Sequence, residues 1–351
     1  MNSPRPSHLA LVLLALASLA PTAACAPEDD EALDVGEEEL RALPGKPAGR
    51  PELPDDYESL RAVEKQELLA QLIQVGTYCA PSDSEAACLG KLPKGGFGYY
   101  VRAIPALLSL RPTFHHASDE APEGRRKIFH PFGVAGTAAF VADYTDTPAP
   151  GTSSRRAPYS GLLANGGKTI PLILRLAPGG GGRMIPGASV KFLIDGKPSR
   201  NFVAIHDFSG LPDHDWNYFS QDLGHIYPEV PWVVKKYFQT VTANPSHLPI
   251  THLGEIAPSG ADVRPAEQST PYEIVLRPTA EVATRFPNAD QHDFRFDLTQ
   301  IEPGTAVYDV MARATKDDTT FERLGSIRTT SPLVASEGGD RQLYFKHSGG
   351  K

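Results

Sequence analysis

The chain has 351 residues and a formal net charge of −8 at pH 7. It is therefore long enough to bury a sizeable core, but it has no basic surplus for neutralising the phosphates of a nucleic acid. Hydrophobic residues make up 40% of the sequence, which excludes a chain that is disordered throughout. The 31 glycines and 33 prolines exceed average usage and favour strands, turns and long loops over a helical bundle.

Residues 1–24 have the parts of an export signal. Arg5 is their one basic residue, an apolar run follows from Leu9, and small residues lead to Cys25. The apolar run is too short to span a bilayer permanently. The Thr-Ala-Ala tripeptide before Cys25 resembles the lipobox of bacterial lipoproteins, although Thr22 stands where that motif usually has leucine. We therefore expect an exported envelope lipoprotein, lipidated at Cys25, on the periplasmic or outer-membrane face. The alternative is ordinary secretion.

Residues 25–56 are acidic and contain several prolines. Such a stretch cannot bury enough apolar surface to offset its chain entropy, so it is predicted to be a flexible tether behind the lipid anchor. The folded domain is then expected at residues 57–351. Contact with the membrane is expected only through the lipid.

Apolar positions recur at helical spacing over residues 57–77, which predicts an amphipathic helix there. Cys79 and Cys88 follow it in a short polar stretch. In an oxidising compartment such a pair is expected to form a disulfide. The alternative, a metal pair, is disfavoured because no histidine lies nearby in the sequence.

Runs of strand-forming residues recur after Lys127 and are interrupted by a helical pattern over residues 215–241. Strands, an inserted helical region and further strands predict an α+β fold. We expect an antiparallel barrel or curved sheet with helical insertions and an N-terminal helix. The predicted strands are residues 137–144, 169–176, 188–194, 201–206, 272–277, 292–301, 306–314 and 322–329.

Two residues stand out as candidates for chemistry. His130 comes just before a strand, and glycines follow it that let another surface approach the backbone closely. Arg175 ends a strongly apolar strand, and a mostly buried arginine needs an anionic partner. That partner is either a carboxylate of this chain, such as Asp143 or Asp207, or a carboxylate on a ligand.

Several short motifs occur in a fixed order: basic-x-x-His-x-x-Gly, Gly-Lys-x-x-Pro-x-x-x-Arg, Val-Lys-Phe, and a polar residue that ends a strand. Their order and spacing over roughly residues 125–330 resemble the haem catalase superfamily, above all its small catalase-related members. Residues 296–299 and the run around 324–327 are similar to the late barrel strands of that family. The resemblance implies a catalase-like β-barrel and a haem cofactor.

The resemblance also implies roles for individual residues. His130 matches the distal histidine, which in catalases moves a proton between the two oxygens of peroxide. Arg175 matches an arginine that pairs with a haem propionate. Lys127, with Arg126 beside it, stands where catalases have a second propionate-binding arginine; lysine keeps the charge but loses the bidentate fork.

The remaining family positions fit less closely. The distal asparagine of catalases falls near His206, and Asn201 is the nearest asparagine, about five residues early. Catalases ligate iron with a tyrosine in an Arg-x-x-x-Tyr helix after the barrel, and this chain has no such motif near its end. Tyr344 and His347 are the late candidates for an axial ligand.

Three functions follow from these patterns. The first is a haem-dependent enzyme of catalase or peroxidase type that decomposes peroxide or an organic hydroperoxide. This first function is the leading hypothesis, and the presence of His130 and Arg175 favours it. The second is a haem-free lipoprotein that keeps the fold for a binding or structural role, and the missing axial-ligand helix favours it. The third is an enzyme that rearranges lipid hydroperoxides. Catalase relatives are often oligomeric, so the resemblance leaves an oligomer open.

Overall fold

The structure of the chain is a computed structural model. The predicted export signal, Cys25, most of the predicted tether and the predicted helix at 215–241 lie outside the described residues. The structure describes residues 51, 53–93, 132–143, 169–179, 184–195, 200–205, 273–286, 294–313 and 317–345.

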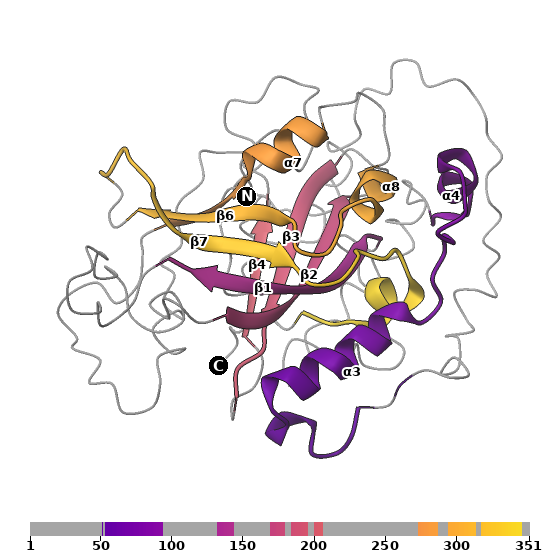
Figure 1. Cartoon of the computed structure of the whole chain (residues 1–351). Helices are drawn as coiled ribbons and strands as arrows, with labels where there is room; N and C mark the ends of the chain where they lie inside the picture. The colour runs from indigo at the N-terminus through magenta and orange to yellow at the C-terminus, as the bar shows by residue number, and fades with distance from the viewer. Residues whose placement is uncertain are drawn as a thin grey trace, which may run out of the picture. The chain divides into compact units, whose positions relative to one another are not determined.

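A seven-stranded antiparallel sheet forms the centre of the described structure, in the order β4-β3-β2-β1-β7-β6-β5 (Figure 1). The sheet curls, and helices lie against it, so the predicted α+β class with an antiparallel sheet is confirmed. Each strand overlaps a predicted one. The strands are β1 (Val134–Ala142), β2 (Thr169–Gly179), β3 (Met184–Phe192), β4 (Arg200–Ile205), β5 (Glu273–Pro278), β6 (Ala306–Arg313) and β7 (Glu322–Thr329).

One face of the sheet carries the main hydrophobic cluster. Side chains alternate between the two faces of a strand, so every second residue of β1 and β2 points into this cluster. Phe140 and Phe192 meet edge to face there, with ring centroids 6.2 Å apart. Strand residues of this cluster include Val134, Ala138, Phe140, Leu172, Leu174, Leu176, Val190, Phe192, Ile274, Leu276, Tyr308, Val310, Leu324 and Ile327.

Three short helices also contribute to the main cluster: α4 (Glu85–Lys91), α7 (Ala280–Arg285) and α8 (Phe294–Thr299). The prediction of a strand at residues 292–301 is wrong, because helix α8 lies within this stretch. Its apolar residues alternate as in a strand, yet Arg295 and Leu298 are buried at a helical spacing of three. The likeness of residues 296–299 to a late barrel strand is therefore not reflected in the structure.

The helix predicted at residues 57–77 is shorter in the structure. A 3-10 turn, η1 (Tyr57–Ser59), precedes helix α3 (Ala62–Gln74). The backbone N–H of Arg61 donates to the Glu64 carboxylate at 3.0 Å, which satisfies a free donor at the start of α3. No helix in the described ranges is both long and apolar enough to cross a bilayer.

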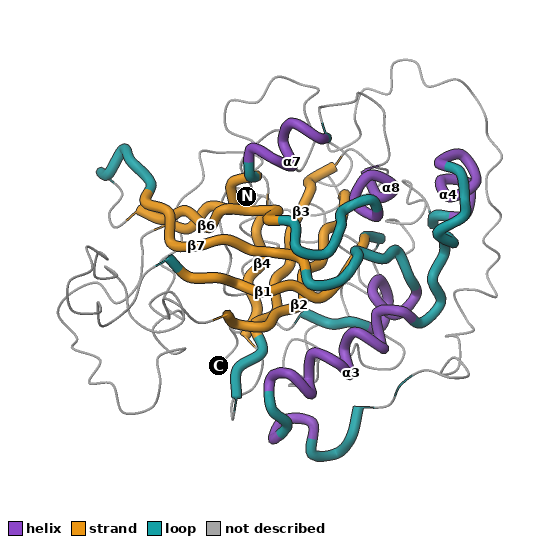
Figure 2. The backbone as a smooth tube through the Cα atoms, viewed as in Figure 1, coloured by secondary structure: helices purple, strands orange, loops and turns teal. Residues whose placement is uncertain are grey.

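Helix α3 packs on the face of the sheet opposite the main cluster, alongside the last described segment of the chain (Figure 2). Leu53, which falls inside the predicted tether, also packs there. We call the buried apolar residues on this face the α3 cluster. Its members are Tyr57, Ala62, Leu69, Leu72, Ile73, Ala135, Ile173, Leu193, Leu343 and Phe345.

The last described stretch, residues 331–345, is the C-terminal segment. It joins β1 through paired backbone hydrogen bonds between Ala135 and Val334, at 3.0 and 2.7 Å. It joins α3 through the Ser336 hydroxyl, which donates to the Ile73 carbonyl. A short π-helical turn, η5 (Gly338–Gln342), follows. The segment therefore ties α3 to the sheet.

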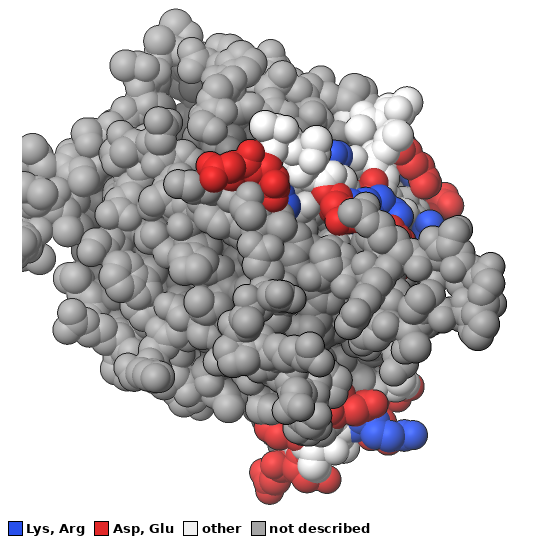
Figure 3. Space-filling view, turned by 90° about the vertical axis from the view of Figure 1, so that its left-hand side faces the viewer, with Lys and Arg blue, Asp and Glu red and all other residues white. Residues whose placement is uncertain are grey.

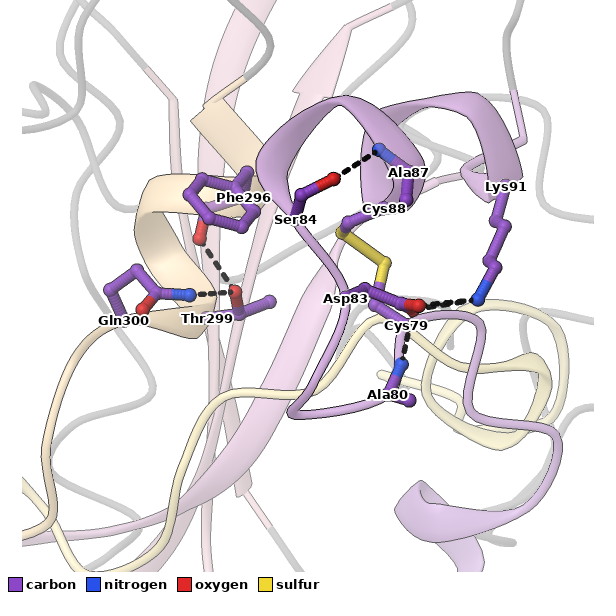
Figure 4. Close-up of a disulfide and its surroundings, with 10 residues drawn as sticks. All are labelled: Cys79, Ala80, Asp83, Ser84, Ala87, Cys88, Lys91, Phe296, Thr299 and Gln300. Atoms are coloured by element: carbon purple, nitrogen blue, oxygen red, sulfur yellow. Dashed lines mark hydrogen bonds and ion pairs between the residues drawn. A yellow bond between two sulfur atoms is a disulfide. The ribbon is translucent and has the colours of Figure 1, made fainter.

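Cys79 and Cys88 form the predicted disulfide (Figure 4). Cys88 lies on α4 rather than in a loop, and Ser84 caps that helix by accepting a hydrogen bond from the Ala87 N–H. Lys91 binds the Asp83 carboxylate at 2.7 Å and so closes the same short loop. Figure 4 shows α4 lying beside α8, which places the disulfide at the border of the main cluster.

Replacing both cysteines of this disulfide with serine is expected to lower the free energy of unfolding by about 2–3 kcal/mol, because the open chain gains loop entropy when it unfolds. Urea unfolding of oxidised wild type and of the double variant measures the difference. Reductant should destabilise the wild type and leave the double variant unchanged. Equal midpoints for the two oxidised proteins would contradict the prediction.

Candidate functional site

The predicted site residues divide into two groups. Arg175 on β2, Asn201 on β4 and Tyr344 in the C-terminal segment are described. The others lie outside the described residues, namely Arg126, Lys127, His130, His206 and His347. The geometry of the site can therefore be built from Arg175, from the backbone just after His130, and from what packs against them.

Arg175 is a buried cation with an anionic partner from the same chain. Its side chain is 3% exposed, and it points to the α3 side of β2 because it lies two residues after Ile173. Its Nη2 lies 3.3 Å from Oδ1 of Asp340, and its Nε donates to the Gly339 carbonyl at 3.1 Å. The predicted need for a carboxylate is thus met by the C-terminal segment.

Asp340 also binds the backbone at the start of β1. The Gly133 N–H donates to the same Asp340 oxygen, Oδ1, at 2.7 Å. Gly133 itself has no room for a side chain, because an added Cβ would overlap the Leu176 carbonyl oxygen. Asp340 is 1% exposed, so one buried carboxylate joins β1, β2 and the C-terminal segment.

The suggested pairing of Arg175 with Asp143 is wrong. Asp143 lies at the far end of β1 and pairs instead with Arg323 on β7. Arg323 also reaches Asp309 on β6 at 2.8 Å, and its side chain is 43% exposed. The nearby carboxylates raise the pKa of the Arg323 guanidinium further above its ordinary value, against the opposing effect of burial. Asp207, the other suggested partner, lies outside the described residues.

Two further polar residues are buried on the same face of the sheet as Arg175. Lys191 on β3 is opposite Ile173 on β2 in the strand register, and Asn201 on β4 is opposite Lys191. The Lys191 ammonium lies 5.3 Å from the ring centroid of Phe345, in the arrangement of a cation–π contact. Asn201 is 9% exposed. The C-terminal segment therefore contacts buried cations on two neighbouring strands, Arg175 on β2 and Lys191 on β3.

Tyr344 sits at the end of the C-terminal segment and is half-buried. Burial raises the pKa of its phenol to about 12, so the hydroxyl is protonated at neutral pH. A tyrosine that ligates iron does so as phenolate, and the bound iron itself lowers the pKa of that phenol. The raised pKa of Tyr344 therefore describes the side chain without a metal beside it.

A small cleft opens between α3 and the start of the C-terminal segment. Its volume is about 210 Å³ and its walls are mainly apolar. The Ser331 hydroxyl at its edge already accepts from the Thr137 N–H at 2.9 Å and donates to the Pro332 carbonyl. The lining residues are Ala70, Gln71, Ile73, Gln74, Gly136 and Ser331.

Among the described residues, Arg175 does not fit the haem-propionate role that the resemblance gives it. Arg175, which the resemblance gives to a propionate, already faces the Asp340 carboxylate, and a second carboxylate would be repelled by the first. Within the described ranges, no cluster of three or more His, Cys, Asp and Glu side chains is arranged to hold a metal ion.

Exposed charges of both signs lie beside one another on the face drawn in Figure 3. Ion pairs at the surface of the described residues include Arg61–Glu64 and Lys91–Asp83. The described part of that face therefore offers no broad surface of a single sign for steering a charged ligand.

Comparison with known proteins assigns no role to these residues. Neither the scan against protein-family models nor the search of curated proteins finds a match to this chain.

Sequence reasoning identified the cation of the site and missed its anion. Asp340 follows two glycines near the end of the chain, in a stretch without helical or strand periodicity. The one available signal was the Gly-Gly-Asp sequence itself, since glycines permit the close approach that buries this segment. That signal does not say which distant residue the aspartate meets.

Proposed function

We propose that this chain is a haem-free exported protein that keeps a catalase-like sheet for a binding or structural role. The Arg175–Asp340 contact carries the proposal, because it satisfies within the chain the cation that a haem propionate would need. The C-terminal segment supports it as well. It packs Leu343 and Phe345 into the α3 cluster and so covers the face on which Arg175 lies.

We infer that the domain lies in the bacterial envelope and is held to the membrane by lipid on Cys25. Secretion is the alternative. The order of motifs between roughly residues 125 and 330 supports a catalase-like barrel as the finer description of the antiparallel sheet. The disulfide supports export, since such bonds persist in oxidising compartments.

Purified from cells supplied with haem, the full chain is expected to show no Soret band and to release no oxygen from peroxide. Absorption spectroscopy and an oxygen electrode measure the two properties. A Soret band together with turnover that His130→Ala abolishes would contradict the proposal. Spectra of Tyr344→Phe and His347→Ala would then identify the axial ligand.

A haem-dependent peroxide-decomposing enzyme is the second candidate, acting on peroxide or an organic hydroperoxide. The observation that favours it is the backbone link at the start of β1. Gly133 is the last residue of the basic-x-x-His-x-x-Gly motif, and its N–H contacts the same Asp340 oxygen as Arg175 does. Two of the motifs that resemble catalases therefore lie close together in the fold. Rearrangement of lipid hydroperoxides would use the same positions.

A further inference from the structure

We propose that Arg175 and the N–H of Gly133 form a carboxylate-binding site, and that Asp340 is its resident ligand. The site accepts a small external carboxylate when the Asp340 side chain is removed, and the C-terminal segment closes it in the wild-type chain. The inference concerns this chain's own carboxylate site and is independent of whether haem binds.

The geometry is that of a receptor for one carboxylate group. The Arg175 guanidinium on β2 and the backbone N–H of Gly133, just before β1, converge on a single oxygen of Asp340, at 3.3 and 2.7 Å. Both donors are fixed by the sheet, since Ala135 on β1 lies opposite Arg175 on β2 in the register. A preorganised pair of donors also binds a free anion, at a cost in translational and rotational freedom that the tethered carboxylate avoids.

Burial strengthens the attraction between the two charges. Arg175 and Asp340 are 3% and 1% exposed, so water screens neither charge. When the carboxylate is deleted, the guanidinium loses this attraction, and an anion that enters the space regains it. A free carboxylate of the right size is the simplest replacement.

The C-terminal segment acts as the tether of this internal ligand. The Gly339 carbonyl accepts from the Arg175 Nε at 3.1 Å, and the Gly339 N–H donates to the Ser336 hydroxyl at 3.0 Å. Leu343 and Phe345 then anchor the segment in the α3 cluster. These contacts hold the Asp340 carboxylate at the donors, so an external carboxylate must displace a ligand that is part of the fold.

The test is size-matched rescue of two cavity variants by sodium formate and sodium acetate. Asp340→Ala removes one carboxylate group, the size of formate, whereas Asp340→Gly also removes the methylene and leaves room for acetate. We expect formate to stabilise the first variant best and acetate the second. The melting temperature should rise by about 2–4 °C at five times the dissociation constant of the anion. Sodium chloride at equal ionic strength should give no such rise.

Three controls separate binding from general salt effects. Wild type should not respond, because Asp340 occupies the site. Asp340→Asn should not respond either, since its amide fills the space and still accepts from Gly133. Asp143→Ala, which removes the exposed partner of Arg323, should respond equally to formate and chloride. Equal responses of the alanine variant to formate and chloride would overturn the proposal.

If the alanine and glycine variants do not fold without a ligand, the measurement becomes the refolding yield after dilution from urea. Formate should raise the yield of Asp340→Ala above that in chloride, and acetate should do so for Asp340→Gly. Yields that do not depend on the anion would overturn the proposal as well.

Discussion

Replacing Arg175 with alanine is expected to lower the free energy of unfolding by about 3–5 kcal/mol, the usual cost of leaving one member of a buried ion pair alone. In this variant Asp340 loses its charged hydrogen-bond donor, although its side chain is only 1% exposed. The Gly339 carbonyl loses its donor from Arg175 Nε in the same change. Equilibrium unfolding in urea, followed by circular dichroism, measures the loss.

Arg323→Ala is the matched control. Arg323 also contacts two carboxylates, on Asp143 and Asp309, but its side chain is 43% exposed. Exposed ion pairs contribute roughly 0–1 kcal/mol each, so this variant should lose far less stability. Equal losses for the two arginine variants would show that Arg175 is not the buried partner described above.

Gly338→Ala is the second change for which a large effect is expected. An added Cβ at residue 338 would overlap the backbone carbonyl of Leu72 on α3. The obstacle is main chain rather than a flexible side chain, so α3 and the C-terminal segment must move apart, at a cost of about 1–3 kcal/mol or more. The melting temperature and the hydrogen exchange of α3 should both report the separation.

Gly90→Ala provides the comparison for that variant. Gly90 lies in helix α4, and a Cβ added there would meet no atom within 4 Å. Alanine favours the helix over glycine by about 0.5–1 kcal/mol, so this variant should match or exceed wild-type stability. If Gly338→Ala were as stable as Gly90→Ala, the close packing of the C-terminal segment on α3 would be refuted.

The sheet could be predicted from the sequence because its strands are long and apolar. The run from Ile170 to Leu176 is almost continuously apolar, as a strand buried on both faces requires, and β2 lies there in the middle of the sheet. The disulfide could be predicted because two cysteines nine positions apart, in a chain that the sequence predicts to be exported, have few other partners. Local composition was sufficient for both.

Helix α8 could not be predicted in the same way. Phe294, Phe296 and Leu298 alternate with polar residues, which is typical of a strand. Arg295 and Leu298 are nevertheless both buried, at the spacing of a helix, and they set the conformation through tertiary packing. In a segment of six residues, packing of this kind outweighs the local pattern.

The partner of Arg175 lay beyond sequence reasoning for a different reason. Burial of the arginine and its need for a carboxylate followed from the apolar strand around it. Asp340 is 165 positions away, however, and is brought in by the packing of the C-terminal segment against α3 and β1. No local pattern encodes such a contact, so Asp143 and Asp207 were equally reasonable candidates.

A double-mutant cycle on Arg175 and Asp340 tests the account most directly. The variants are Arg175→Met, Asp340→Asn and their combination, each compared with wild type by urea unfolding. The double variant is expected to lose less free energy of unfolding than the sum of the losses in the two single variants. The difference, the coupling energy, should be about 1–3 kcal/mol. Strict additivity, with a coupling energy near zero, would contradict the claim that the chain satisfies Arg175 with its own carboxylate.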